Sequence, residues 1–227
     1  DYAGVHPERI DVVYNGADLD HYSPRHRDQG KQLVLKKHAI ANPYILYTAR
    51  LEHPGKNHVN LLEAFARLKE KSGLPHQLVL AGSPWYGADA VYAATRDLGI
   101  EEYVCFTGFV DDADLPSLYA GADLFVFPSL FEGFGIPLLE AMASGTPVCA
   151  SNVSSIPEVV KNAGLLFNPG DADDIAANML RIILDSSLRD KLIRRGLRQS
   201  GLFSWDDSAR QVHNLCRVAC TSIPAAA

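Results

Sequence analysis

Two glutamates, Glu132 and Glu140, stand eight positions apart in the segment EGFGIPLLE, the part of this sequence best suited to chemistry. Gly133 and Gly135 lie between them, and their lack of side chains lets backbone N–H groups approach a ligand closely. The proline that follows is typical of the first turn of a helix, which would place these N–H groups at the positive end of the helix dipole. The segment therefore predicts an anion site suited to a pyrophosphate. The flanking carboxylates could accept hydrogen bonds from a sugar diol.

The helix dipole offers a simpler explanation of one of these glutamates. A carboxylate near a helix N-terminus stabilises the helix by about 0.3–1 kcal/mol, which alone accounts for Glu140. This explanation does not cover Glu132 or the two glycines, and we therefore favour a binding site.

Two cations, Arg50 and Lys56, lie six positions apart after a predicted strand. An arginine at a strand end can hold an anion through two parallel hydrogen bonds. Lys56 precedes Asn57, a candidate helix N-cap, where a cation is unfavourable unless an anion shares the site. The residues alone leave the question open, because two solvated surface charges explain them equally well.

Short apolar runs that alternate with segments of helical periodicity would position these side chains. Several runs, such as LFVF and PVCA, are apolar on both faces, which is typical of strands covered by helices on both sides. The alternation predicts an α/β fold with a doubly wound, Rossmann-like parallel sheet. The predicted strands are residues 10–14, 44–49, 77–81, 104–107, 124–127, 147–150 and 165–167.

Helices are predicted between these strands, the first beginning at Asn57 with an apolar stripe along one face. Residues 25–42 are polar and poorly patterned, and we expect a loop there. We expect one domain over residues 1–220 and a disordered tail over residues 221–227. The other predicted helices are residues 89–98, 112–119, 137–143, 154–160, 173–184, 188–200 and 205–218.

Ligands of open parallel sheets bind at the carboxyl ends of the strands. Gly82 comes directly after one predicted strand, and Val110 and Asp112 come after the next, so all three would lie at the same edge as the cations and the glutamates. We expect these residues to share one site with them.

Other signals of chemistry are weak. The GFGIPL run lacks the third glycine of a dinucleotide fingerprint, and the residues around Lys56 lack those of a P-loop. The D-A-D pairs at residues 112–114 and 171–173 open predicted helices, where capping explains them better than metal binding. The histidines have no metal-ligand spacing, and we expect no metal site.

The composition, 227 residues with 47% hydrophobic and 21% charged, is that of a globular protein. The net charge of −6 and the lack of long basic runs argue against a nucleic-acid partner. No apolar run is long enough to span a membrane, and the first residues lack the pattern of a signal peptide. We interpret the cysteines as reduced thiols of a cytoplasmic protein, with two of them in the core. They are Cys105, Cys149, Cys216 and Cys220.

Five segments, in order along the chain, resemble retaining glycosyltransferases of family 4, which have the GT-B fold. The resemblance covers roughly residues 5–215 and is most specific in the E-x7-E block. It implies that this chain is the C-terminal, donor-binding half of a GT-B enzyme whose N-terminal acceptor domain is absent from this sequence. The segments are VVYNGADLDHYSP, YTARLEHPGKN, FTGFVDDADLPSLYAGADLFVFPS, FEGFGIPLLEAMASGTPVCAS and ASNVSSIPEVVKNAGLLFNPGD.

The resemblance assigns roles to the candidate site residues. Arg50 and Lys56 would bind the donor diphosphate, and Glu132 would face the transferred sugar, so that these three form the catalytic set. Glu140 would bind the ribose hydroxyls, and Asp112 would suit the edge of a guanine base. The other implied donor-binding positions are Gly82, Val110, Gly133, Phe134, Gly135 and Ile136.

The implied function is transfer of a hexose, with mannose favoured, from a nucleotide diphosphate sugar to a glycan or lipid-linked acceptor, with retention of configuration. We favour a GDP-sugar over a UDP-sugar and expect no cofactor. The acceptor would bind the missing domain, so this chain alone would be inactive. The whole enzyme would work in the cytoplasm, with peripheral contact at the inner face of the membrane. A GT-B sugar-nucleotide epimerase and a non-catalytic nucleotide-binding module remain as alternatives.

Overall fold

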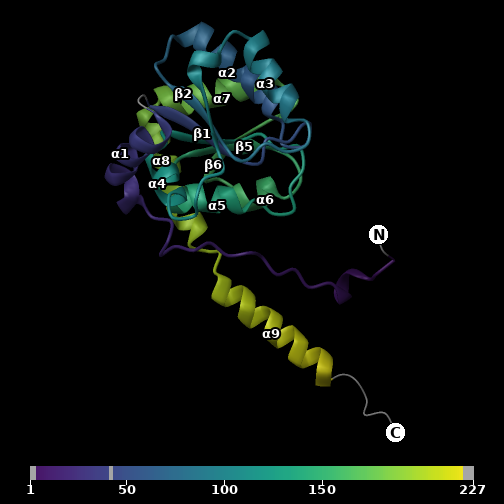
Figure 1. Cartoon of the computed structure of the whole chain (residues 1–227). Coiled ribbons are helices and arrows are strands. Elements are labelled where there is room, and N and C mark those ends of the chain that lie inside the picture. The colour runs from purple at the N-terminus through teal and green to yellow at the C-terminus, as the bar shows by residue number, and fades with distance from the viewer. Residues whose placement is uncertain (1–3, 41–42, 222–227) are drawn as a thin grey trace.

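The structure, a computed structural model, describes residues 4–40 and 43–221, and within these ranges six parallel strands form one sheet (Figure 1). The strands are β1 (Tyr44–Thr48), β2 (Gln77–Ala81), β3 (Val104–Gly108), β4 (Leu124–Phe127), β5 (Val148–Ser151) and β6 (Gly164–Phe167). Their order is β3-β2-β1-β4-β5-β6, so the direction of winding reverses between β1 and β4. This confirms the predicted doubly wound, Rossmann-like sheet.

Helices cover both faces of the sheet, which explains why the central strands are apolar on both sides. The helices are α1 (Arg27–His38), α2 (His58–Ser72), α3 (Ala88–Asp97), α4 (Leu115–Gly121), α5 (Ile136–Ala143), α6 (Ile156–Val160), α7 (Ala172–Leu184), α8 (Ser186–Ser200) and α9 (Trp205–Thr221), with short 3-10 turns η1 (Pro7–Arg9), η2 (Pro24–His26) and η3 (Glu101–Tyr103). In Figure 1, α2, α3 and α7 lie above the strands, whereas α4, α5 and α6 lie below them.

Residues 10–14 do not join the sheet, so the strand predicted there is wrong. The segment runs instead beside the start of α9, where Ser208 donates a hydrogen bond to the carbonyl of Tyr14. Farther along, the N–H of Ala17 donates to the carbonyl of Phe203 over 3.0 Å. An apolar, β-branched run favours extended backbone, but only a neighbouring strand can turn it into part of a sheet.

Residues 25–42 contain the end of η2 and all of α1, so the loop predicted there is also wrong for the residues that the structure describes. The helix packs against α4, with Val34 buried in the contact. Gly30 makes this approach close, because a Cβ atom there would lie 2.4 Å from the carbonyl oxygen of Ser117. Helix formation here depends on tertiary packing rather than on a strong local pattern.

Helix capping by aspartate was predicted at two places, and the structure confirms only one of them. Asp171 caps α7, since its carboxylate accepts hydrogen bonds from the N–H groups of Asp173 and Asp174. The capping predicted at residues 112–114 is wrong: α4 begins later, and Asp114 bonds to Lys37 over 2.5 Å instead of to its own helix.

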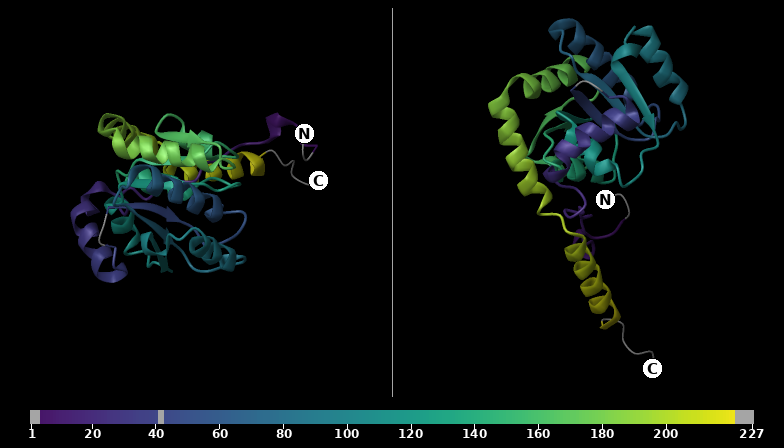
Figure 2. Two further views of the ribbon diagram at one scale, coloured as in Figure 1. Left: turned by 90° about the horizontal axis from the view of Figure 1, so that it is seen from above. Right: turned by 60° about the vertical axis from the view of Figure 1, so that its left-hand side comes forward.

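The first described residues and α9 extend away from the body, with α9 projecting as a single helix (Figures 1 and 2). The tail predicted at residues 221–227 lies outside the described residues apart from Thr221, which ends α9. None of the helices in the described ranges is both long and apolar enough to cross a membrane. The four cysteines are free thiols, with Cys149 buried, Cys105 half-buried and the two on α9 exposed.

Candidate functional site

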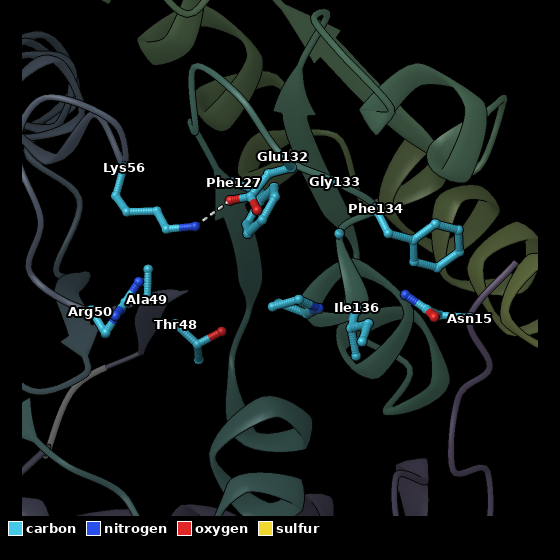
Figure 3. A pocket seen from close by; sticks show the side chains of 12 residues that line it. Asn15, Thr48, Ala49, Arg50, Lys56, Phe127, Glu132, Gly133, Phe134 and Ile136 are labelled. Atoms are coloured by element: carbon cyan, nitrogen blue, oxygen red, sulfur yellow. Dashed lines mark hydrogen bonds and ion pairs between the residues drawn. The ribbon is translucent and has the colours of Figure 1, made fainter. Parts of the chain in front are cut away.

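A cavity of about 600 Å³ opens at the carboxyl edge of the sheet, between the ends of β1 and β4. The winding of the sheet reverses at this point, which is where open α/β sheets bind their ligands. Figure 3 shows cationic side chains entering from the segment after β1 and Glu132 from the loop after β4. The lining residues are Asn15, Thr48, Ala49, Arg50, Lys56, Phe127, Glu132, Gly133, Phe134, Gly135, Ile136 and Pro137.

Lys56 and Glu132 form an ion pair across this cavity, with 2.7 Å between Nζ and Oε1 (Figure 3). Both side chains are mostly buried, at 23% and 15% exposed. The backbone of Lys56 is fixed as well, because the Tyr47 hydroxyl donates to its carbonyl over 2.9 Å. The lysine is therefore held in place and is not a freely solvated surface charge.

Asn57 supports this loop by a route that the sequence did not predict. It stands at the N-cap position of α2, but its side chain makes no capping hydrogen bond and its φ is +59°. Its buried amide donates instead to the carbonyls of Pro128 and Pro169, at 2.9 and 2.8 Å. The predicted capping role is wrong, and the side chain ties the Lys56 loop to the segments after β4 and β6.

Arg50 lies at the rim of the cavity and is about half exposed. Its guanidinium is 3.4 Å from the carboxylate of Glu52 and lies over the ring of Trp85, 4.8 Å from the centroid. Both contacts leave donors of the guanidinium fork available, because Arg carries five N–H groups.

The N-terminus of α5 faces the same cavity. Gly135 occupies the N-cap position with φ +107°, a left-handed conformation that favours glycine. The first N–H groups of the helix have no partner within it, and the helix dipole makes this end positive. A Cβ atom added at Gly133 would meet no atom within 4 Å, so a ligand could approach this backbone closely.

Glu140 does not line the cavity but is connected to it by hydrogen bonds. The Tyr119 hydroxyl donates to its carboxylate over 2.8 Å and also contacts the Thr48 hydroxyl, which lines the cavity, at 2.7 Å. Burial raises the pKa of the Glu140 carboxyl, although hydrogen bonds from Tyr119 and Tyr22 oppose the shift. The carboxylate is therefore oriented by phenols beside the cavity.

Three other predicted site residues lie outside the cavity lining. Asp112 is exposed, yet it lies close enough to Glu140 for its charge to raise the pKa of that carboxyl further. Val110 belongs to the same loop as Asp112, and its side chain is buried. Gly82 packs against the cavity wall, since a Cβ atom there would lie 2.0 Å from the carbonyl oxygen of Ala49. Among the described residues, no group of three His, Cys, Asp or Glu side chains could hold a metal ion.

Comparison with known proteins decides the family. The sequence model described as "Glycosyl transferases group 1" matches residues 31–199. The chain belongs to this family. This confirms the resemblance to glycosyltransferases that was drawn from the sequence.

This chain is similar in sequence to part of several curated proteins. It is 41% identical over 182 residues to the O-antigen chain mannosyltransferase B of Escherichia coli, covering 80% of this chain and 48% of that protein. The chain thus spans about half the length of the curated relatives it matches.

Solved structures of other proteins share the fold. Anabaena HepE in complex with UDP and glucose superposes with a TM-score of 0.82 at 26% identity, covering 98% of this chain and 59% of that chain. The C-terminal domain of LpcC from Francisella tularensis superposes with a TM-score of 0.68 at 26% identity, covering 82% of this chain and 97% of that chain. These neighbours confirm the Rossmann-like architecture of the GT-B class.

The structure also reveals site residues of this group 1 glycosyltransferase chain that the sequence analysis missed. Thr48 ends β1 and Ala49 follows it, directly before Arg50, so the rule that ligands bind at strand ends could have found both. Asn15 lines the cavity from the position directly after the strand predicted over residues 10–14. Tyr119 carries no local signal, because its role depends on the fold bringing it to Glu140.

Proposed function

We propose that this chain is the donor-binding half of a retaining glycosyltransferase that transfers a hexose, with mannose favoured, from a nucleotide diphosphate sugar. One observation supports the proposal above all: Arg50, Lys56 and Glu132 line a single cavity together with the N-terminus of α5. The cavity lies where the sheet changes its direction of winding. The named function of the mannosyltransferase relative supports the choice of sugar.

In this proposal, the donor diphosphate lies between the two cations and the N-terminus of α5. Charge develops on the leaving diphosphate as the glycosidic bond breaks, and preorganised cations and N–H groups stabilise that charge. Arg50 is suited to two parallel hydrogen bonds, whereas Lys56 acts as a point charge. Gly133 and Gly135 let the phosphates contact the backbone, with Phe134 and Ile136 beside them. We expect no metal ion to be needed.

The rest of the donor would extend along the edge of the sheet. Glu140 would accept hydrogen bonds from the ribose hydroxyls, since its carboxylate is held beside the cavity by Tyr119. The base would then lie over the loop of Val110 and Asp112, where an acidic side chain suits guanine. We therefore favour a GDP-sugar. HepE was solved with UDP, and a UDP-sugar is the alternative donor.

Glu132 would face the transferred hexose from the opposite end of the diphosphate. None of the residues around the cavity is arranged as a dedicated nucleophile with its own base, and the nearest carboxylate is already paired with Lys56. We infer that configuration is retained by substitution on the face of the leaving diphosphate, rather than by the two-carboxylate scheme of glycosidases.

The acceptor would bind a second domain, because the chain spans about half of its curated relatives. We expect a glycan or a lipid-linked acceptor, the latter reached through peripheral contact at the cytoplasmic face of a membrane. We also expect little or no transfer by this chain alone. Robust turnover of a sugar donor onto an acceptor by the 227 residues would contradict that division of roles.

The decisive experiment is isothermal calorimetry of this chain with GDP, UDP and ADP, each with and without Mg²⁺. Selective binding of one diphosphate, unchanged by the metal, would support the donor site and identify the base. Absence of binding to all three would refute a donor site formed by this chain.

A further inference from the structure

Two consecutive serines, Ser154 and Ser155, hold the loop that carries Glu132. The Ser154 hydroxyl accepts a hydrogen bond from the N–H of Glu132 over 3.1 Å. The Ser155 hydroxyl lies 3.0 Å from the carbonyl oxygen of Glu132 and 3.1 Å from that of Phe134, and its single proton serves both acceptors. Both backbone polar groups of Glu132 are therefore held by one pair of serines.

The local structure of this serine pair is unusual for a simple helix start. Ser155 occupies the N-cap position of α6, where a serine side chain normally bonds to the N–H groups of its own helix. It makes no such bond, and its hydroxyl points to the loop instead. Ser154 has a left-handed φ of +51°, which favours glycine over other residues. Ser155 therefore bonds to the Glu132 loop and does not cap its own helix. Ser154 bonds to the same loop from a backbone conformation that is unfavourable for serine.

A second contact joins α6 to the same loop. Glu158 of α6 accepts a hydrogen bond from the hydroxyl of Tyr14. The ring of Tyr14 packs on that of Phe134 with 5.9 Å between centroids, and Phe203 completes the cluster. Residues at and near the start of α6 therefore hold the loop on both sides of Gly133. Ser154 and Ser155 bond to the backbone of Glu132 and Phe134, and Glu158 bonds to Tyr14, which packs on Phe134.

Fixing the backbone at Glu132 also fixes the range of its side chain. The carboxylate reaches Lys56 over 2.7 Å from a loop that has no regular secondary structure of its own. A glutamate on a mobile loop would populate many positions and would lose entropy on each contact with a ligand. The serine contacts remove part of that freedom before any ligand binds.

We propose that Ser154 and Ser155 are positioning residues that aim the carboxylate of Glu132 at the hexose of the donor. The inference rests on the proposed function, because it assigns the sugar to Glu132. It adds that discrimination between a nucleotide diphosphate and its sugar conjugate depends on hydroxyl groups outside the cavity lining.

The first test needs no ligand and measures amide hydrogen exchange of Glu132 by NMR. Ser154→Ala removes the acceptor of this N–H, so exchange should accelerate by about two- to tenfold. Ser72→Ala is the matched control, because it removes a hydroxyl that bonds to a backbone carbonyl on α2, far from the loop. Unchanged exchange at Glu132 in Ser154→Ala would overturn the serine contact whatever the chain binds.

The second test compares the affinities of GDP and GDP-mannose, or of UDP and UDP-glucose if UDP is the diphosphate that binds. Ser155→Ala should reduce affinity for the sugar conjugate by about tenfold relative to wild type, with affinity for the diphosphate alone changed less than twofold. Ser155→Thr keeps the hydroxyl and should restore the wild-type ratio.

The outcomes of the second test separate the two proposals. Equal losses for diphosphate and sugar conjugate in Ser155→Ala would show a general structural defect and overturn the positioning role. Unchanged affinities for both ligands in Ser155→Ala would overturn it as well. A wild-type chain that binds neither diphosphate would refute the proposed function, and the assignment of the sugar to Glu132 would fall with it, while the exchange experiment would still decide whether Ser154 holds the loop.

Discussion

Lys56 and Glu132 are 76 positions apart in the sequence, yet their charged atoms lie 2.7 Å apart across the cavity. A partly buried ion pair is favourable only while each charge keeps its partner. A diphosphate entering the cavity would compete with Glu132 for the ammonium group, and the carboxylate would then be free to turn to a sugar. Exchange of partners therefore follows from the geometry if the cavity binds the proposed donor.

Loss of Lys56 and loss of the Glu132 charge should differ in their effect on diphosphate binding. Lys56→Ala should weaken binding of the nucleoside diphosphate by about 10–100-fold, because a charge-assisted hydrogen bond is lost. Glu132→Gln should leave that affinity unchanged or raise it, since the competitor for Lys56 is neutralised. Calorimetry on both variants measures this difference. Lys71→Ala, which removes a surface lysine paired with Asp173, serves as the control. Weaker diphosphate binding by Glu132→Gln would contradict the competition.

Glu140 should matter to the ribose through its carboxylate. We expect Glu140→Gln to weaken nucleotide-sugar binding by about tenfold, whereas Glu70→Gln, a change on the exposed face of α2, should have no effect. Tyr119→Phe should produce a smaller loss, because it removes only a hydroxyl that orients the carboxylate. Equal affinities for Glu140→Gln and Glu70→Gln in calorimetry would refute the ribose role.

The pH dependence of binding offers a further check on Glu140. Its raised pKa means that the carboxyl gains a proton at a higher pH than an exposed glutamate would. Affinity should therefore begin to fall at a higher pH in the wild-type chain than in Glu140→Gln. Superimposable affinity–pH curves for the two proteins would rule out a role of the ionised carboxylate.

Substitution of two glycines should distinguish an effect on stability from an effect on diphosphate binding. A methyl group at Gly82 would overlap the carbonyl of Ala49, so Gly82→Ala should lower the free energy of unfolding by about 1–3 kcal/mol. A methyl group at Gly133 would meet open space, so Gly133→Ala should fold normally but lose diphosphate affinity. Urea denaturation and calorimetry measure the two effects, with Gly170→Ala, where the nearest atom is 3.5 Å away, as the control. Normal affinity in Gly133→Ala would place the phosphates elsewhere.

His58 should make the fold sensitive to acid. Burial lowers its pKa from 6.5 to about 4, so between these values the unfolded chain binds a proton that the folded chain does not. The stabilising contribution of neutral His58 should therefore be fully present above about pH 6.5. The free energy of unfolding should fall by about 3 kcal/mol as the pH drops from there to about 4. Burial also lowers the pKa of His76, which acts in the same direction.

The contribution of His58 is isolated by comparing urea denaturation of wild type and His58→Gln across this pH range. The loss of stability with falling pH should be less steep in the variant. His213→Gln, which changes an exposed histidine on α9, should keep the wild-type slope. Parallel slopes for His58→Gln and wild type would exclude His58 as the acid-sensitive group.

The sequence by itself determined the class of the fold, the six strands of its sheet and several of the residues that line the cavity. Runs such as residues 124–127 are apolar at every position, and this local pattern suffices because burial on both faces requires it. The E-x7-E block and the cations after β1 were also visible, since residues at parallel strand ends meet at one edge whatever the details of packing. Local sequence patterns were therefore enough to predict the strands and to indicate the edge of the sheet at which the site lies.

Only the tertiary structure decided which partner each side chain has. Residues 10–14 had the pattern of a strand but found no neighbouring strand, whereas residues 27–38 had a poor helical pattern and were stabilised by α4. Asn57 looked like a cap and instead bonds to carbonyls 71 and 112 positions away. Ser154 reaches a backbone N–H 22 positions away in the same manner. These choices are invisible in a local pattern because a hydrogen-bonding group is satisfied by whichever partner the folded chain brings within reach.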